Sequence, residues 1–241
     1  MNRPSLLVPM RVLAAALVGI VLWDSSRLDL ALALLLGRPD GFPLRDAWYL
    51  TSGLHTGGLI ASWAVVSALC VGVWFPRGPL ARLDAAQRLR LAITPMLAVL
   101  TVSSLKTIST TSCPWDLTVF GGVARLVSHW TLVVGGDGGP GRCFPAGHAS
   151  AGFMFIGGYF VFREHDPRIA RVWLLSALIA GLVLGGGQQL RGAHFMSHTL
   201  WTGWICGCVG WTVEVAAALL RRAATTPNPM AVRREATSAI D

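Results

Sequence analysis

Residues 143–162, "CFPAGHASAGFMFIGGYFVF", decide the fold, because a histidine stands directly in front of a long apolar run. Residues 149–162 contain no charged side chain. The run is shorter than the about 20 residues that cross a bilayer, so we expect its helix to extend through polar ends. A histidine at the entrance of a membrane segment is costly, and His148 therefore marks a candidate functional site.

The composition is that of an integral membrane protein. Of 241 residues, 53% are hydrophobic and 13% are charged, and the mean hydropathy is +0.56. A soluble domain usually carries about 25% charged residues. The net charge of +8 comes from basic residues clustered between apolar runs, without a long basic run or an interleaved aromatic and basic patch. Membrane topology produces this pattern, so we expect no nucleic-acid partner.

Six apolar runs are predicted to be membrane spans, because crossing takes roughly 17–25 residues and the shorter runs extend through polar helix ends. A further run, 28–37, is too short and is expected to lie in the interface or to be re-entrant. We therefore predict an all-α, polytopic membrane protein with an active site at its outer face. Its single domain covers residues 1–222, and a polar, disordered cytoplasmic tail covers 223–241. The predicted transmembrane helices are about residues 9–23, 57–75, 91–110, 149–162, 172–187 and 195–219.

The arginines predict the orientation of these spans. They are concentrated in the loops 76–90 and 163–171 and at the start of the tail. By the positive-inside rule these segments and both termini are cytoplasmic, and 111–147 and 186–194 face outward. The first span resembles a signal peptide, but no small-x-small cleavage site follows it. We expect it to be retained, with a cleaved signal as the alternative. The predicted location is a bacterial inner membrane, with a periplasmic site.

Ionisable residues gather on that outer face. Lys106 lies inside an otherwise apolar helix, and His194 and His198 are four residues apart, so they share a helix face. His148 lies in the first turn of its helix, where free backbone N–H groups favour an anion such as phosphate. Lys106 and Arg191 add positive charge. Histidines and cations together predict phosphoryl transfer through a covalent phosphohistidine.

Together these segments resemble the type 2 phosphatidic acid phosphatase superfamily of membrane lipid phosphatases, whose members also have six spans. The signature of that superfamily is Lys-x6-Arg-Pro, Pro-Ser-Gly-His and Ser-Arg-x5-His-x3-Asp. The order and spacing of all three blocks recur here between residues 106 and 198. They appear as Lys106, six residues, Cys113-Pro114; as Pro145-Ala146-Gly147-His148; and as Gly187-Gln188, five residues, His194, three residues, His198.

The resemblance implies a role for each matched residue. His194 matches the nucleophile that attacks phosphorus. His148 matches the general acid that protonates the leaving lipid oxygen. Lys106 matches a phosphate clamp, helped by the amide of Gly147. The implied activity is that of a phosphoric monoester hydrolase acting on lipid phosphates, and we expect neither a metal nor a cofactor.

Three of the departures from the family pattern remove a charged side chain. Cys113 and Gln188 replace arginines, and His198 replaces the aspartate that orients the nucleophile. Gln188 is a candidate phosphate-binding residue, with a packing role as the alternative. We count His198 among the catalytic residues, because a neutral His198 can accept a hydrogen bond from the ring N–H of His194. It supplies no negative charge.

Substitutes for the lost charges lie nearby in the sequence. Arg191, one helical turn before the nucleophile, and Arg142, just before the second motif, are candidates for the missing arginine. Membrane anchoring is the alternative for Arg191. Asp116 is a candidate for the lost carboxylate, with a role in a turn or cap as the alternative. His55 and His129 match no motif and are expected to be ordinary polar residues.

Cys113 and Cys143 are expected to form a disulfide bond. Both lie on the outer side, where disulfides persist if that side is the periplasm, and the other three cysteines lie in spans. Closing a loop of this length stabilises the fold by roughly 3–4 kcal/mol if strain is small. The bond would tie the end of the Lys106 helix to the turn before the second motif. Two free thiols are the alternative.

The predicted function is removal of phosphate from a lipid phosphate or diphosphate. Candidate substrates are phosphatidylglycerol phosphate, phosphatidate, undecaprenyl diphosphate and the lipid A phosphate. Three alternatives stay open. A phosphotransferase would use the same intermediate with another acceptor, and a non-catalytic relic would bind a phospholipid without turnover. A zinc-dependent hydrolase would use His194 and His198 with His148, His129 or Asp116 as the third ligand.

Overall fold

The computed structural model describes residues 6–130 and 136–225, and every regular element in those ranges is a helix. Of the predicted tail, residues 226–241 lie outside the described residues. Residues 223–225 continue the last helix, so the helix extends beyond the predicted domain boundary. The elements are α1 (Leu7–Ser25), α2 (Leu28–Leu36), the π-helix η1 (Tyr49–Gly57), α3 (Gly58–Trp74), η2 (Gly78–Arg82), α4 (Ala85–Ile108), η3 (Pro114–Asp116), η4 (Thr118–Phe120), α5 (Gly147–Phe153), η5 (Met154–Gly157), α6 (Gly158–Phe162), α7 (Pro167–Leu190) and α8 (Met196–Thr225).

Five helical segments among the described residues are long and apolar enough to cross a membrane, and each contains most of one predicted span. The sixth predicted span, 149–162, forms three consecutive short helices, α5, η5 and α6, of 7, 4 and 5 residues. None of the three reaches spanning length by itself. The run 28–37 forms the short helix α2, as its length predicted. The five spanning segments are Leu7–Ser25, Tyr49–Arg82, Ala85–Ile108, Pro167–Leu190 and Met196–Ala224.

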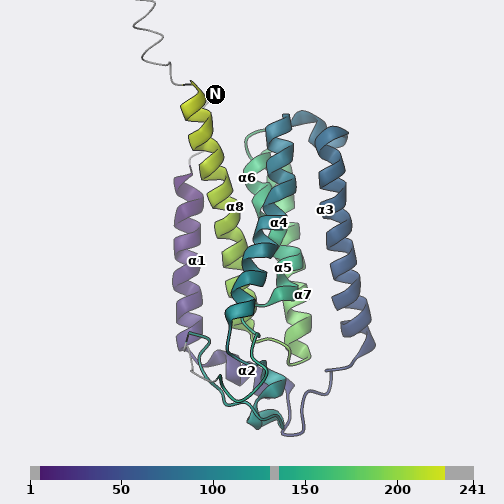
Figure 1. Cartoon of the computed structure of the whole chain (residues 1–241), viewed down its shortest axis with the longest axis vertical. Helices are drawn as coiled ribbons and strands as arrows, with labels where there is room; N and C mark the ends of the chain where they lie inside the picture. Colours follow the sequence, from purple (N-terminus) through teal and green to yellow (C-terminus); the bar gives the residue numbers. More distant parts are fainter. Residues whose placement is uncertain (1–5, 131–135, 226–241) are drawn as a thin grey trace, which may run out of the picture.

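The long helices lie side by side, and α2 and the connection between α4 and α5 gather at one end of the bundle, the lower end in Figure 1. Helix α4 ends there, and α5 and α8 begin there. A small apolar core lies among these connections, with Phe42, Leu117, Phe120 and Phe195 all buried. This core supports the segments that carry the motif residues.

The start of α4 is fixed by a capping box. Asp84 Oδ1 accepts a hydrogen bond from the Gln87 backbone at 2.8 Å, and Gln87 Oε1 accepts one from the Asp84 backbone at 2.9 Å. These two bonds satisfy backbone donors that a helix start leaves without partners. Because α4 begins at a defined residue, its last turn, which contains Lys106, reaches a defined position at the other end.

Helices α5 and α7 touch through their backbones. A Cβ atom added to Gly152 would lie 2.2 Å from the Gly181 nitrogen, and one added to Gly181 would lie 2.2 Å from Phe153 Cδ1. Small residues permit such close approach between membrane helices. The contact fixes the start of α5, which carries His148, against α7, which leads into the turn that carries His194.

Candidate active site

The turn between α7 and α8 presents His194. Gly192 in this turn has a φ of +76°, and a Cβ atom there would lie 2.3 Å from Phe42 Cδ2. Glycine is therefore required for both its backbone conformation and its lack of a side chain. The Gly192 carbonyl accepts a hydrogen bond from the Trp115 backbone at 2.9 Å. Asp29 of α2 accepts one from the Ser197 backbone at 3.0 Å, so both sides of the turn are held.

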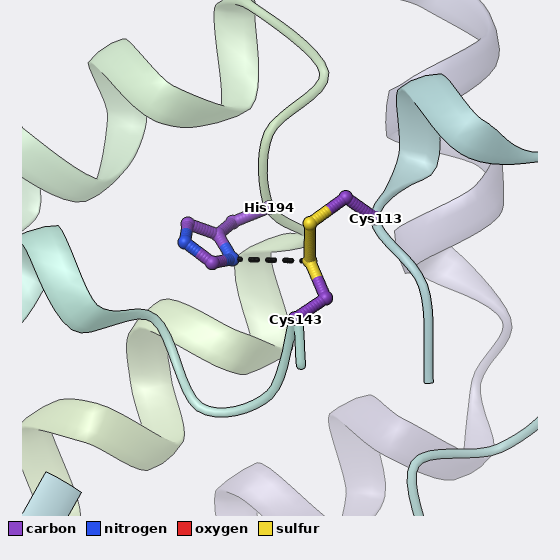
Figure 2. Close-up of side chains that lie close together, drawn as sticks. All are labelled: Cys113, Cys143 and His194. Carbon is purple, nitrogen blue, oxygen red and sulfur yellow. Dashed lines mark hydrogen bonds between the residues drawn. A yellow bond between two sulfur atoms is a disulfide. The ribbon is translucent and has the colours of Figure 1, made fainter. Parts of the chain in front are cut away.

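His194 is buried against a disulfide bond (Figure 2). Cys113 and Cys143 are joined, with 5.1 Å between their Cα atoms, so the expected disulfide is present. The side chain of His194 is 3% exposed, and its Nδ1 lies 3.4 Å from Cys143 Sγ. A disulfide sulfur carries no proton and can only accept. A hydrogen bond between these two atoms therefore requires the tautomer of His194 that carries its proton on Nδ1 and its lone pair on Nε2.

His148 and Lys106 lie on the same side of the bundle end as His194. His148 is the second residue of α5, and its ring centroid is 6.3 Å from that of His194. The Lys106 side chain passes the start of α5, with Cδ 3.6 Å from the position that a Cβ atom of Gly147 would occupy. Among the described residues, Lys106 has no side-chain hydrogen bond or ion pair. Its positive charge is available to an anion.

His55 is a site residue that sequence reasoning missed. Its ring centroid lies 3.9 Å from that of His148, and it comes from the π-helix that leads into α3. π-Helical segments are rare in proteins, and those that occur often lie at functional sites. From the sequence His55 is an ordinary polar residue without a motif. One signal could have found it: it stands just in front of the predicted span 57–75, the kind of placement that singled out His148.

Arg191 is held in place by its neighbours. Its Nε donates to the Arg45 carbonyl at 2.7 Å, and its Nη1 donates to Gln188 Oε1 at 3.1 Å. Its guanidinium also lies 5.9 Å from the ring centre of Trp115. Gln188, which is buried, thus positions an arginine. The charge of Arg191 acts on both His55 and His148.

Of three further candidates, only His198 is brought to this group. His198 is buried with its ring 5.8 Å from that of His194, and its Nδ1 has no hydrogen-bond partner in the described part of the chain. His194 Nδ1 faces the disulfide, and the acceptance of a hydrogen bond from His194 by His198 stays a prediction. Asp116 accepts from Trp115 Nε1 at 3.0 Å and caps η3, so it does not replace the lost carboxylate. The exposed Arg142 side chain has no hydrogen bond or ion pair within the described residues.

The surroundings of His194 keep its ring neutral. Burial lowers the pKa of His194 well below its ordinary value of 6.5, and repulsion by His198, Lys106 and His148 in their protonated forms lowers it further. No carboxylate is among these electrostatic partners. A neutral imidazole retains the lone pair that a nucleophile needs.

The structure does not assemble the ligands that the zinc alternative requires. Within the described residues, the one group of metal-ligand type is Cys113, Cys143 and His194, whose ligand atoms lie within 4.8 Å of one another. The two sulfurs are bonded to each other, and a thiolate is the form of cysteine that binds metal. His129, one of the suggested third ligands, instead lies 3.2 Å from Asp24 and stacks on Phe144 at 4.1 Å.

The long apolar helices define a helical membrane protein, and at one end of the bundle they bring together histidines and cations, the side chains that a phosphate-like anion would require. The family model of the PAP2 superfamily matches residues 87–221, more than half of the chain, and the chain belongs to this superfamily. The resemblance inferred from the three motifs is thereby confirmed. Membership indicates a phosphatase that acts on phosphate esters, commonly those of lipids. Comparisons with curated proteins and with solved structures gave no match.

Proposed function

We propose that this protein is an integral membrane phosphatase that removes phosphate from a lipid phosphate or diphosphate through a phosphohistidine at His194. The observation that carries the proposal is the environment of His194. Its neutral ring donates from Nδ1 to a sulfur, which leaves the Nε2 lone pair for attack. The nearby charges come from Lys106 and other basic side chains, which suits a dianionic substrate.

In the first step the Nε2 lone pair of His194 attacks phosphorus and the bond from phosphorus to the lipid oxygen breaks. Burial lowers the pKa of His148 to about 4, and the negative charge of a bound phosphate dianion opposes this shift. The step uses the protonated form of His148, which gives its proton to that oxygen. The 6.3 Å between the two ring centroids suits this arrangement, because an attacking atom starts about 3–3.5 Å from its target. Lys106 and the Gly147 amide stabilise the charge on the phosphoryl oxygens, with Arg191 as the further cation.

In the second step water attacks phosphorus. His148, which is now neutral, accepts a proton from this water, and the bond from phosphorus to His194 Nε2 breaks. Inorganic phosphate leaves and His194 returns to its neutral form. The cycle needs only side chains of this protein and water. Gln188 contributes by holding Arg191. Arg142 is the weaker candidate for phosphate binding, because it is exposed and nothing in the described part of the chain positions its side chain.

We place the reaction at the outer surface of a bacterial inner membrane. In this topology α5, η5 and α6 together form the sixth pass and both termini are cytoplasmic. The disulfide at the site end supports a periplasmic location, because disulfides persist in oxidising compartments. The substrate candidates remain phosphatidylglycerol phosphate, phosphatidate, undecaprenyl diphosphate and the lipid A phosphate.

The test is phosphate release by the purified protein from each of these four lipids. We expect release from at least one lipid, and loss of release in His194→Asn. His165→Asn is the matched control, because His165 is exposed and lies between α6 and α7, away from the site end. An active His194→Asn protein would refute the mechanism. Phosphate that appears on a second lipid instead of in solution would identify a transferase with the same first step.

A further inference from the structure

Two departures from the family motifs concern the surroundings of His194. Cys113 stands where the first motif has arginine, and His198 stands where the third motif has the aspartate that orients the nucleophile. His198 Nδ1 has no hydrogen-bond partner among the described residues, whereas His194 Nδ1 lies 3.4 Å from Cys143 Sγ. Cys143 is bonded to Cys113. The atom next to His194 Nδ1 therefore belongs to the bond formed by the cysteine that stands in place of the arginine.

We propose that the Cys113–Cys143 disulfide is the positioning group for His194 and takes the part of the missing aspartate. It holds the proton on Nδ1 and so leaves the lone pair on Nε2, the nitrogen that attacks phosphorus. This inference rests on the proposed phosphohistidine mechanism. The disulfide does not contact substrate, and it acts only through His194.

The packing around the sulfur fixes it in this position. Cys143 is fully buried, and the Ala193 carbonyl oxygen lies 3.1 Å from its Sγ. The Cys143 backbone donates to the Thr111 carbonyl at 3.0 Å. The sulfur thus touches the residue directly before His194 as well as the ring itself, so the position of the acceptor and the position of the nucleophile are set together.

The oxidation state decides what the sulfur can do. A disulfide sulfur only accepts a hydrogen bond, but a thiol can donate its S–H. Reduction by an added dithiol transfers two electrons and two protons to the protein, giving two thiols, while the dithiol becomes a cyclic disulfide. The Cys143 thiol can then donate to Nδ1. This moves the ring proton to Nε2 and removes the attacking lone pair, so the oxidised protein is the active form.

The experiment measures phosphohistidine formation in a single turnover, together with the tautomer of His194 from its ¹⁵N chemical shifts. It compares the oxidised full-length protein, the dithiol-treated protein and Cys113→Ala/Cys143→Ala. We expect the dithiol-treated protein and the double cysteine variant to form phosphohistidine at least about tenfold more slowly than the oxidised protein. The reason is that a catalytic histidine in the wrong tautomer is a poor nucleophile. Cys206→Ala, which changes a buried free cysteine, should match the oxidised wild type.

A rescue separates positioning from stability. Adding His198→Asp to the double cysteine variant returns the carboxylate of the family motif, and we expect faster phosphorylation, whereas His198→Asn should not give it. The inference is overturned if the double cysteine variant keeps the tautomer of His194 that is protonated on Nδ1. It is also overturned if this variant loses rate in proportion to its loss of thermal stability and His198→Asp restores neither the rate nor the stability. If the oxidised wild type forms no phosphohistidine, the proposed function fails, and the tautomer comparison still decides the role of the disulfide.

Discussion

The imidazole rings of His55 and His148 are in direct contact, with 3.9 Å between their centroids and 41° between their planes. The two residues come from the π-helix before α3 and from the start of α5, segments that lie far apart in the sequence. His148 Nδ1 is buried and has no hydrogen-bond partner among the described residues, so ring contacts such as that with His55 position this side chain.

Replacing His55 tests whether this contact supports the general acid. We expect His55→Ala to lower kcat for a lipid substrate by about tenfold, because a misplaced acid transfers its proton less efficiently. The same variant should have a smaller effect on an aryl phosphate, whose leaving group needs little protonation. Equal effects on the two substrates would show that His55 acts on phosphate binding or on folding.

Replacing His148 itself should produce a larger difference between a lipid phosphate and an aryl phosphate than replacing His55 does. We expect His148→Asn to slow cleavage of a lipid phosphate by about 10²–10⁴-fold, because an alkoxide must be protonated as it departs. With an aryl phosphate, phosphohistidine should form at close to the wild-type rate and then be hydrolysed slowly, since the base for water is missing. Rapid-quench measurement of the phosphoenzyme distinguishes these two steps. Unchanged cleavage of the lipid would exclude His148 as the acid.

Arg191 provides the test of the substitute cation. Its guanidinium group donates hydrogen bonds to both the Arg45 carbonyl and the Gln188 side chain, and lysine cannot reproduce that geometry. We expect Arg191→Lys to lower kcat/KM by about tenfold or more, a loss that corresponds to roughly 1.4 kcal/mol. Arg171→Lys is the control, because Arg171 is exposed near the start of α7, at the other end of this helix, where its Nε donates to the Pro167 carbonyl at 3.1 Å. If Arg191→Ala retains full kcat/KM, Arg191 is only an anchor.

The pH dependence of phosphohistidine formation follows from the lowered pKa of His194. A histidine loses its lone pair when it is protonated, which for an ordinary ring occurs as the pH falls through 6.5. Because burial and neighbouring positive charges lower the pKa of His194, we expect its loss of nucleophilicity only at more acidic pH. Single-turnover rates with an aryl phosphate measure this limb without requiring the general acid. Lys106→Gln removes a positive charge and should therefore shift this loss of rate to higher pH. A loss of rate centred at pH 6.5 in the wild type would contradict the lowered pKa of His194.

Chelation separates the proposed mechanism from a zinc-dependent one. We expect EDTA to leave phosphate release unchanged, because the cations that the mechanism uses are side chains. Activity that is lost to EDTA and restored by zinc would support the metal alternative instead. The His198→Ala variant adds a second criterion. If His198 were a zinc ligand, its removal would lower the metal content of the purified protein, which can be measured directly.

The motifs predicted much of the site because they depend on local spacing. The positions of Lys106, His148 and His194 follow from helix ends and turns that the sequence encodes, such as the cap at Asp84 and the glycine at 192. The apolar runs likewise predicted where the long helices lie. The short pieces of the run 149–162 were not predicted, since a hydropathy pattern does not show where a helix changes from one geometry to another.

Contacts between distant segments explain what the sequence could not provide. His55 reaches His148 only because the start of α3 packs against α5 and α7. The sulfur at His194 Nδ1 depends on the disulfide as well as on the turn around Gly192. Asp116 and His198 occupy suggestive positions in the sequence, but a local cap and the orientation of the neighbouring ring decide their partners.

The contact between Gly152 and Gly181 lies one helical turn below His148, inside the bundle. It holds the helix that carries His148 against the helix that leads into the turn of His194, and so it helps to set the separation of the two rings. A single methyl group at either glycine would push the two helices apart. In the proposed mechanism, the distance between acid and nucleophile therefore depends on two glycines that carry no functional side chain.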